Sequence, residues 1–155
     1  MISIKLIHLQ TPRGKRSIGP GQPAFIIAEM SCNHNQSYNR ALKIIDAAAA
    51  AGADAIKLQT YTADIHTINS NKKFFQITSN KLWAGQTLYQ LYQKIYTPWE
   101  WHPKLQRYAA TKGLVFFSSP SDATSVKFLE QLNVPLYKIA SYEMVDLSLL
   151  KVVAQ

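Results

Sequence analysis

The chain has little cysteine, no long hydrophobic run and no long run of one charge. Cys32 is the single cysteine among 155 residues, which excludes an internal disulfide and predicts a reducing, cytoplasmic location. No apolar stretch approaches the roughly 20 residues that a membrane-spanning helix needs. Residues 1–5 also lack the apolar core of a signal peptide. These absences predict a protein without a membrane partner.

The basic balance of the chain does not point to nucleic acid. The net charge is +8, but the lysines and arginines are scattered over different predicted elements. No basic run of five or more occurs, and zinc-finger, helix-turn-helix and RNP motifs are missing. We therefore expect no nucleic-acid partner. Solvated surface lysines account for most of the charge, and small anionic substrates are a second use for some of it.

Several common catalytic motifs are also missing. The sequence has no Gly-x-Ser-x-Gly elbow, which excludes the usual serine hydrolase arrangement. It has neither a Walker A loop nor a Gly-x-Gly-x-x-Gly turn, so the common phosphate-binding and dinucleotide-binding loops are excluded. Any active site must be built from other groups.

What is present is a regular alternation of strand and helix patterns. The hydrophobic content of 47% suits a globular protein. A hairpin is predicted from residues 2–7 and 16–18, around a turn at 11–14. A polar stretch at 60–85 is too long for an ordinary connection. We expect strands at 25–29, 54–59, 114–118 and 136–140. We expect helices at 38–51, 87–96, 98–112, 124–132 and 147–154.

This order of elements predicts an α/β fold with a parallel sheet covered by helices. Two architectures fit four such strands: a small open sheet, or half of a (β/α)₈ TIM barrel, which takes about 250 residues when complete. We expect an N-terminal hairpin extension at residues 1–20. Residues 21–155 are then expected to form the N-terminal half of a (β/α)₈ barrel.

The second predicted strand separates apolar from polar side chains. Ile56 and Leu58 share one face, while Lys57 and Gln59 share the other. In a barrel the apolar pair would pack on the helices, and the polar pair would point inside near the C-terminal rim. A lysine there needs an anion or a carboxylate as partner. The alternative is an edge lysine that reaches out to water.

The other predicted strands also end in polar groups. These are Glu29, Asn33 and His34 after the first strand, Ser118 and Ser119 after the third, and Lys138, Ser141 and Glu143 after the fourth. Ser121 or Asp122 is expected to cap the following helix, which leaves Ser118 and Ser119 free. Lysines and serines beside a helix N-terminus suit a phosphate, and carboxylates suit sugar hydroxyls or proton transfer. Singly, His34 could be structural and Glu143 could cap a turn.

With these residues in hand, the chain resembles the sialic acid synthase family, whose members condense phosphoenolpyruvate with a sugar to make nonulosonic acids. The matching blocks are FIIAEMSCNH at 25–34, ADAIKLQ at 53–59, SSPSD at 118–122 and YKIASYE at 137–143. The blocks at 82–92 and 96–102, with Met30 and Ser31, resemble the pseudaminic acid synthase branch. N-acetylneuraminate and legionaminate synthases are the alternative branches.

The resemblance implies a TIM barrel that joins phosphoenolpyruvate to an acetamido-trideoxyhexose. It implies roles for nine residues: Lys57, Ser119, Lys138 and Ser141 at phosphoenolpyruvate, Glu29 at the sugar, Glu143 at the proton of the attacking water, and Asn33, His34 and Gln59 at the rim. Trp99, Glu100, Trp101 and His102 shape the sugar pocket, or the two tryptophans pack between helices. Two departures adjoin the site: Cys32 stands where the branch usually has Gly, and Ser121 replaces an aromatic residue.

The resemblance also implies a homodimer and a divalent metal such as Mn²⁺. In the family, the metal-binding histidines lie on later barrel strands, beyond these 155 residues. We therefore expect no metal ligands in this chain and no synthase activity from it alone. The alternative is a non-catalytic remnant that folds only with a complementary half.

Overall fold

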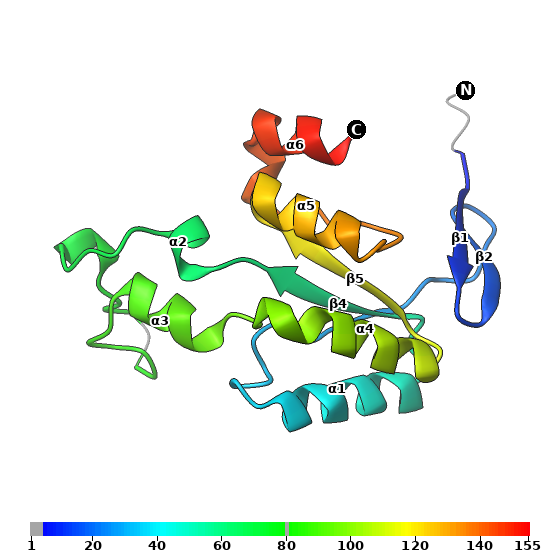
Figure 1. The fold of residues 1–155 in the computed structure, drawn as a ribbon, viewed down its shortest axis with the longest axis horizontal. Coiled ribbons are helices and arrows are strands. Elements are labelled where there is room, and N and C mark those ends of the chain that lie inside the picture. The colour runs from blue at the N-terminus through cyan, green and yellow to red at the C-terminus, as the bar shows by residue number, and fades with distance from the viewer. Residues whose placement is uncertain (1–4, 80) are drawn as a thin grey trace.

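A parallel sheet flanked by helices forms the centre of the molecule (Figure 1). The computed structural model describes residues 5–79 and 81–155. Its sheet has the order β3-β4-β5, with both neighbouring pairs parallel. The strands are β3 (Ile27–Glu29), β4 (Ala55–Thr60) and β5 (Val115–Pro120). This arrangement confirms the α/β class and the first three predicted strands.

An antiparallel hairpin precedes this sheet and pairs only with itself. Its strands are β1 (Ile7–Thr11) and β2 (Gly14–Ile18), and Thr11 pairs with Gly14 across the turn. The predicted turn is confirmed, but of the described residues in the predicted strand at 2–7 only Ile7 lies in β1. Pairing starts directly at the turn and extends back to Ile7; residues 1–4 lie outside the described part of the chain. In Figure 1 the hairpin lies at the N-terminal end of β4 and β5.

Helices follow each strand of the parallel sheet, as predicted. Their ends differ slightly from the predicted ends. They are α1 (Tyr38–Ala50), α2 (Ala63–His66), α3 (Leu88–Ile95), α4 (His102–Thr111), α5 (Ala123–Gln131) and α6 (Leu147–Val153). Gly52 follows α1 with φ +79°, the left-handed conformation expected after a helix end. Pro98 does not start α4, because a 3₁₀ turn (Trp99–Trp101) intervenes. Within the described residues, no helix is long and apolar enough to cross a membrane.

The long polar stretch after β4 contains short helical segments. These are α2 and a 3₁₀ turn (Lys73–Phe75). Gln76 then bridges back to Thr87, the capping residue of α3. Thus the stretch that looked too long for a connection is folded above the C-terminal end of the sheet.

The two faces of β4 carry different side chains, as predicted: one face is apolar, and the other carries Lys57 and Gln59. Ile56 and Leu58 are fully buried in the main apolar core, which also contains residues of α1 and α4. On the opposite face, Ala55 joins a smaller cluster with Val115 and Phe117. Lys57 and Gln59 continue that second face toward the C-terminal end of the strand.

The predicted fourth strand at 136–140 is reduced to one bridge. Tyr137 pairs with Ser118, and the Lys138 N–H donates to the Ser118 carbonyl at 3.2 Å. The chain then turns at Ser141, directly before a 3₁₀ segment (Glu143–Val145). Because the segment pairs on one side and turns away early, it forms no regular ladder. The direction of the bridge is nevertheless parallel, as predicted.

Asp122 is the residue that caps α5. Its side chain accepts from the Ser125 N–H at 2.8 Å, and the Ser125 hydroxyl lies 3.0 Å from the Asp122 N–H. Burial alone would raise the pKa of Asp122, but hydrogen bonds from Thr124 and Ser125 lower it. The carboxylate therefore stays charged at the helix N-terminus.

Replacing Asp122 with alanine is expected to lower the free energy of unfolding by about 1 kcal/mol, since an N-cap acceptor is lost. Urea unfolding followed by tryptophan fluorescence measures the change. Asp122→Asn keeps an acceptor oxygen and should lose less. Equal losses in both variants would contradict the capping role.

Candidate functional site

A hollow opens at the C-terminal ends of β4 and β5. Its inner cavity has a volume of about 230 Å³, and an adjoining one has about 420 Å³. Five residues line both: His66, Tyr92, Ser121, Tyr142 and Glu143. Cys32, Gln59, Tyr61 and Ser119 line the inner cavity. The C-terminal ends of parallel strands are where active sites form in α/β barrels.

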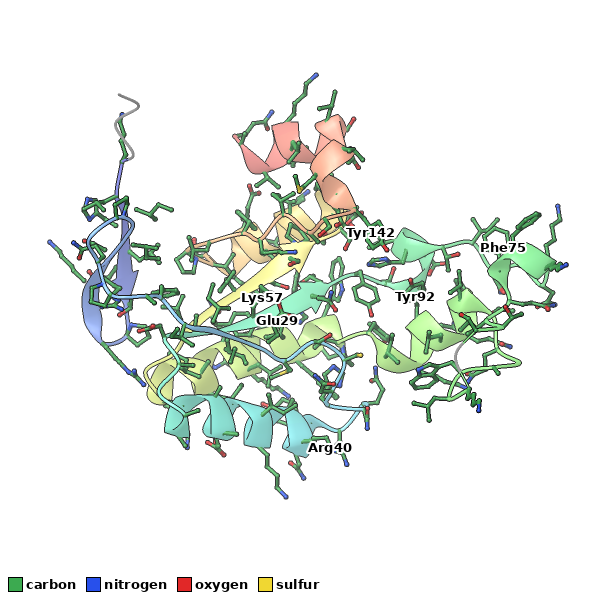
Figure 2. The ribbon with its side chains drawn as sticks, turned by 180° about the vertical axis from the view of Figure 1, so that it is seen from behind. Glu29, Arg40, Lys57, Phe75, Tyr92 and Tyr142 are labelled. Atoms are coloured by element: carbon green, nitrogen blue, oxygen red, sulfur yellow. The ribbon has the colours of Figure 1, made fainter. Side chains whose placement is uncertain are left out.

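An ion pair lies on the inner face of the sheet below this hollow. The Lys57 ammonium is 2.8 Å from a carboxylate oxygen of Glu29, and the two residues are direct partners between β3 and β4. Figure 2 shows them side by side at the sheet. Lys57 is 6% exposed, whereas the Glu29 side chain is 60% exposed. The predicted carboxylate partner of the inward lysine is therefore present.

The next row up the sheet carries Gln59 and Ser119, which are partners between β4 and β5. The Ser31 hydroxyl donates to the Gln59 carbonyl oxygen at 3.3 Å. The Ser119 hydroxyl and one Glu143 carboxylate oxygen are buried, and neither has a hydrogen-bond partner among the residues that the structure describes. A buried polar atom without a partner costs about 1–3 kcal/mol. Both atoms belong to residues that line the inner cavity, so a polar ligand there would satisfy them.

Comparison with known proteins assigns the family. The family model described as "NeuB family" matches residues 44–155. The chain belongs to the NeuB family.

Individual relatives agree with this assignment. The chain is 47% identical over 134 residues to pseudaminic acid synthase of Helicobacter pylori, covering 86% of this chain and 39% of the relative. It is 47% identical over 131 residues to pseudaminic acid synthase of Campylobacter jejuni, covering 84% and 38%. The chain thus spans about two fifths of the length of these relatives.

A solved structure supports the fold. The crystal structure of N-acetylneuraminic acid synthetase from Leptospira borgpetersenii, in complex with citrate, superposes with a TM-score of 0.74 at 28% identity. The match covers 96% of this chain and 46% of that one. The predicted resemblance and the predicted fold class are both confirmed.

Two predicted rim residues of the NeuB chain lie elsewhere. His34 is fully buried: its Nε2 is 3.0 Å from the Thr97 hydroxyl, and its Nδ1 accepts from the Gln36 N–H. Burial lowers the pKa of His34, so the ring is neutral. The rim placement is wrong for His34, because protein groups occupy both nitrogens. Asn33 is exposed and does not line the hollow.

Ser118 is also not free, contrary to expectation. Its hydroxyl is 2.6 Å from the Thr60 hydroxyl, which in turn lies 2.9 Å from Nε2 of His102. All three residues are fully buried on the helix side of the sheet. Strand parity explains the difference, since Ser118 and Ser119 point to opposite faces.

The tryptophan-rich segment before α4 packs between elements. Trp99 stacks on Phe128 of α5 with ring centroids 4.8 Å apart. Trp101 contacts the rings of His34 and Tyr38. Of the two interpretations of this segment, packing therefore accounts for its contacts.

The fourth segment contributes unequally to the hollow. Glu143 lines both cavities. Lys138 is half-buried and Ser141 is exposed, and neither lines either cavity. The structure therefore gathers Gln59, Ser119 and Glu143 around the hollow. The Glu29–Lys57 pair lies one row below Gln59 on the sheet.

Three aromatic rings in the hollow were not singled out from the sequence. Tyr61 follows β4 directly and contacts the rings of His66 and Tyr92 at 4.1 and 5.8 Å between centroids. Burial is the main cause that raises the pKa of the Tyr61 phenol. The available signal was position, because Tyr61 and His66 come directly after a strand whose end faces the barrel rim.

The donor set does not fit the divalent metal that the family resemblance implies. Over residues 5–79 and 81–155, no three His, Cys, Asp or Glu side chains gather closely enough to hold a metal ion.

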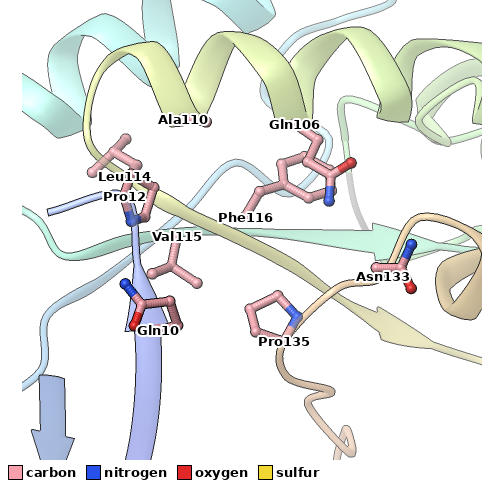
Figure 3. Close-up of a pocket in the computed structure, with 9 residues that line it drawn as sticks. All are labelled: Gln10, Pro12, Gln106, Ala110, Leu114, Val115, Phe116, Asn133 and Pro135. Carbon is pink, nitrogen blue, oxygen red and sulfur yellow. The ribbon is translucent and has the colours of Figure 1, made fainter. Parts of the chain in front are cut away.

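A second pocket lies at the opposite end of the sheet and has different chemistry. It has a volume of about 260 Å³ between the hairpin, α4 and the start of β5 (Figure 3). Its lining is Gln10, Pro12, Gln106, Ala110, Leu114, Val115, Phe116, Asn133 and Pro135. None of these side chains can act as an acid, a base or a nucleophile near neutral pH. The hollow at the C-terminal end is the better candidate site.

Proposed function

We propose that this chain supplies the phosphoenolpyruvate side of a nonulosonic acid synthase of the pseudaminic acid type, a C–C bond-forming transferase. The observation that carries the proposal is the buried Lys57 beside Glu29, one row below the unpartnered Ser119 hydroxyl. The 47% identity to pseudaminic acid synthases supports the branch. The shared length of about two fifths limits the proposal to this part of the reaction machinery.

The proposed reaction joins two carbon skeletons and releases phosphate. C3 of phosphoenolpyruvate attacks the aldehyde carbon of an open-chain acetamido-trideoxyhexose, and the aldehyde oxygen takes up a proton. Water adds at C2 and loses a proton, and the C–O bond to phosphate breaks. Phosphoenolpyruvate, sugar and water thus give a nonulosonic acid and phosphate.

The residues of the chain have separate tasks in this scheme. Lys57 balances the negative charge of phosphoenolpyruvate from below the hollow, and the Ser119 hydroxyl donates a hydrogen bond to it. The family resemblance assigns Lys138 and Ser141 to the same ligand, although neither lines the two cavities. Glu143 has a buried oxygen without a partner, which suits it to take the proton of the attacking water.

The sugar meets the outer end of the site in this scheme. Glu29 is exposed enough to accept from a sugar hydroxyl while it stays paired with Lys57. Gln59 shapes the adjacent wall of the inner cavity.

A chimera tests the proposal. Residues of this chain replace the matched 134-residue segment of the Helicobacter pylori pseudaminic acid synthase, and phosphate release is measured with phosphoenolpyruvate and an acetamido-trideoxyhexose. We expect turnover from the chimera and none from its Lys57→Met variant. The chain alone, without the remaining part of the Helicobacter pylori enzyme, is expected to be inactive.

Two results would overturn the proposal. One is a chimera with the circular dichroism of the parent enzyme but without turnover. The other is a chimera that prefers N-acetylmannosamine, which would move the chain to the N-acetylneuraminate branch.

A further inference from the structure

His66 is a titratable group in the hollow that the proposed reaction leaves without a task. It is the last residue of α2, and its ring lies between two tyrosine rings. The centroids are 4.1 Å from Tyr61 and 5.0 Å from Tyr92. Nε2 is 3.2 Å from the Ser121 hydroxyl, and both residues line both cavities. The aromatic contacts hold the ring at the rim, where a ligand can reach it.

The His66–Ser121 pair offers one donor and one acceptor in either tautomer. If Nε2 accepts from the Ser121 hydroxyl, the Nδ1 N–H is a donor and the serine oxygen is an acceptor. If Nε2 donates to the serine oxygen, Nδ1 is the acceptor and the serine hydroxyl is the donor. Burial lowers the pKa of His66 more than the charge of Glu143 raises it, so the ring is neutral.

Apolar side chains line the same two cavities as this pair. Ile65 and Tyr92 line the outer cavity, and Ile95 lines the inner one. A ligand group that matches this combination carries an N–H, a carbonyl oxygen and a methyl group. An acetamido group has all three.

We propose that His66 and Ser121 form a specificity subsite that binds an acetamido group of the sugar substrate. The identity of the ligand as a sugar rests on the proposed function, whereas the preference for an acetamido group follows from the pair and its apolar walls. Both residues would select the substrate and take no part in proton transfer to the reacting carbons.

Binding of N-acetylmannosamine to the chain tests this subsite, with mannose as the probe that lacks the acetamido group. Ligand-observed NMR gives the dissociation constants. We expect N-acetylmannosamine to bind more tightly than mannose. His66→Phe and Ser121→Ala should each weaken N-acetylmannosamine binding about tenfold and leave mannose unchanged.

The hairpin supplies a matched control. Nδ1 of the exposed His8 is 3.0 Å from the Ser17 hydroxyl, so His8→Phe and Ser17→Ala remove the same kind of pair far from the hollow. Neither should change sugar binding. Ser121→Ala also covers the case in which His66→Phe fails to fold.

Phosphoenolpyruvate binding, followed by ³¹P NMR in the same samples, separates the two proposals. The subsite alone is overturned if the chain binds phosphoenolpyruvate but binds the two sugars with equal affinity. It is also overturned if the chain binds phosphoenolpyruvate and Ser121→Ala leaves the N-acetylmannosamine affinity unchanged. An acetamido preference that Ser121→Ala abolishes, without phosphoenolpyruvate binding, supports the subsite and overturns the proposed function.

Discussion

Replacing Lys57 with methionine is expected to weaken phosphoenolpyruvate binding to the chain about 100-fold. The reason is the burial of the ammonium group: Lys57 is 6% exposed and lies on the inner face of the sheet below the hollow. A hydrogen bond to a charged group in such a setting contributes about 1.5–3 kcal/mol, and 2.8 kcal/mol corresponds to about 100-fold. Titration followed by ³¹P NMR measures the change.

The same substitution should lower the free energy of unfolding by no more than about 1 kcal/mol. Methionine has nearly the length of lysine and replaces a buried charge with an apolar group, which is often neutral or stabilising. Glu29 loses its partner but keeps its water, because its side chain is 60% exposed. Urea unfolding should therefore show no loss beyond about 1 kcal/mol.

Lys112→Met is the matched control for this variant. The Lys112 ammonium is 2.7 Å from Asp46, so this ion pair is as short as that of Lys57, but it is exposed and lies outside the hollow. Phosphoenolpyruvate should bind the control and the unchanged chain equally. If both lysine variants weaken binding by the same factor, the effect is one of net charge, and the role of Lys57 is wrong.

The local patterns of the chain predicted those features that depend on neighbouring residues in sequence. Alternation in residues 54–59 was enough to assign Ile56 and Leu58 to the helix side and Lys57 to the inner face. Asp122 was one of two predicted caps, and it makes the capping bonds. These features are local because side-chain direction has a period of two in strands, and because caps bind the first turn of their own helix.

Features that depend on residues far away in the sequence were harder to predict. The turn of the hairpin is marked by Pro12 and Gly14, but nothing local says how far the two strands pair. The segment at 136–140 has a strand-like composition, yet regular strand structure requires a partner along its length, and only Tyr137 forms a bridge.

Histidine roles show the same limit at the site. His34 follows a strand end and resembled a rim residue, but it is buried against Thr97 and Trp101, which come much later in the chain. His66 lies in a polar stretch without periodicity and faces the hollow. Both histidines follow the end of a strand, and only tertiary contacts separate the buried ring from the accessible one.

The second buried histidine, His102, is expected to make the chain less stable as the pH falls from 6.5 toward 4. Its Nδ1 N–H donates to the Pro98 carbonyl at 3.2 Å, and its Nε2 accepts from the Thr60 hydroxyl at 2.9 Å. Burial lowers the pKa of His102 from the ordinary 6.5 to about 4, and hydrogen bonds to the Pro98 and Trp99 carbonyls oppose this only in part.

The sign follows from proton binding in the two states. Between pH 6.5 and 4 the unfolded chain binds a proton on residue 102 that the folded chain does not bind, so acid favours unfolding. The stabilisation is complete above pH 6.5 and is lost progressively below it. From pH 7.5 to 4.5 the loss from this residue amounts to about 2–3 kcal/mol. The lowered pKa values of His34 and His66 act in the same direction.

Urea unfolding of the unchanged chain and of His102→Gln at pH 7.5 and 4.5 isolates this contribution. The variant should be less stable at pH 7.5, since glutamine fills the ring volume poorly, but its further loss at pH 4.5 should be about 2–3 kcal/mol smaller. His8→Gln changes an exposed histidine and should follow the unchanged chain at both values. Equal acid losses in the unchanged chain and His102→Gln would contradict a lowered pKa of His102 in the folded state.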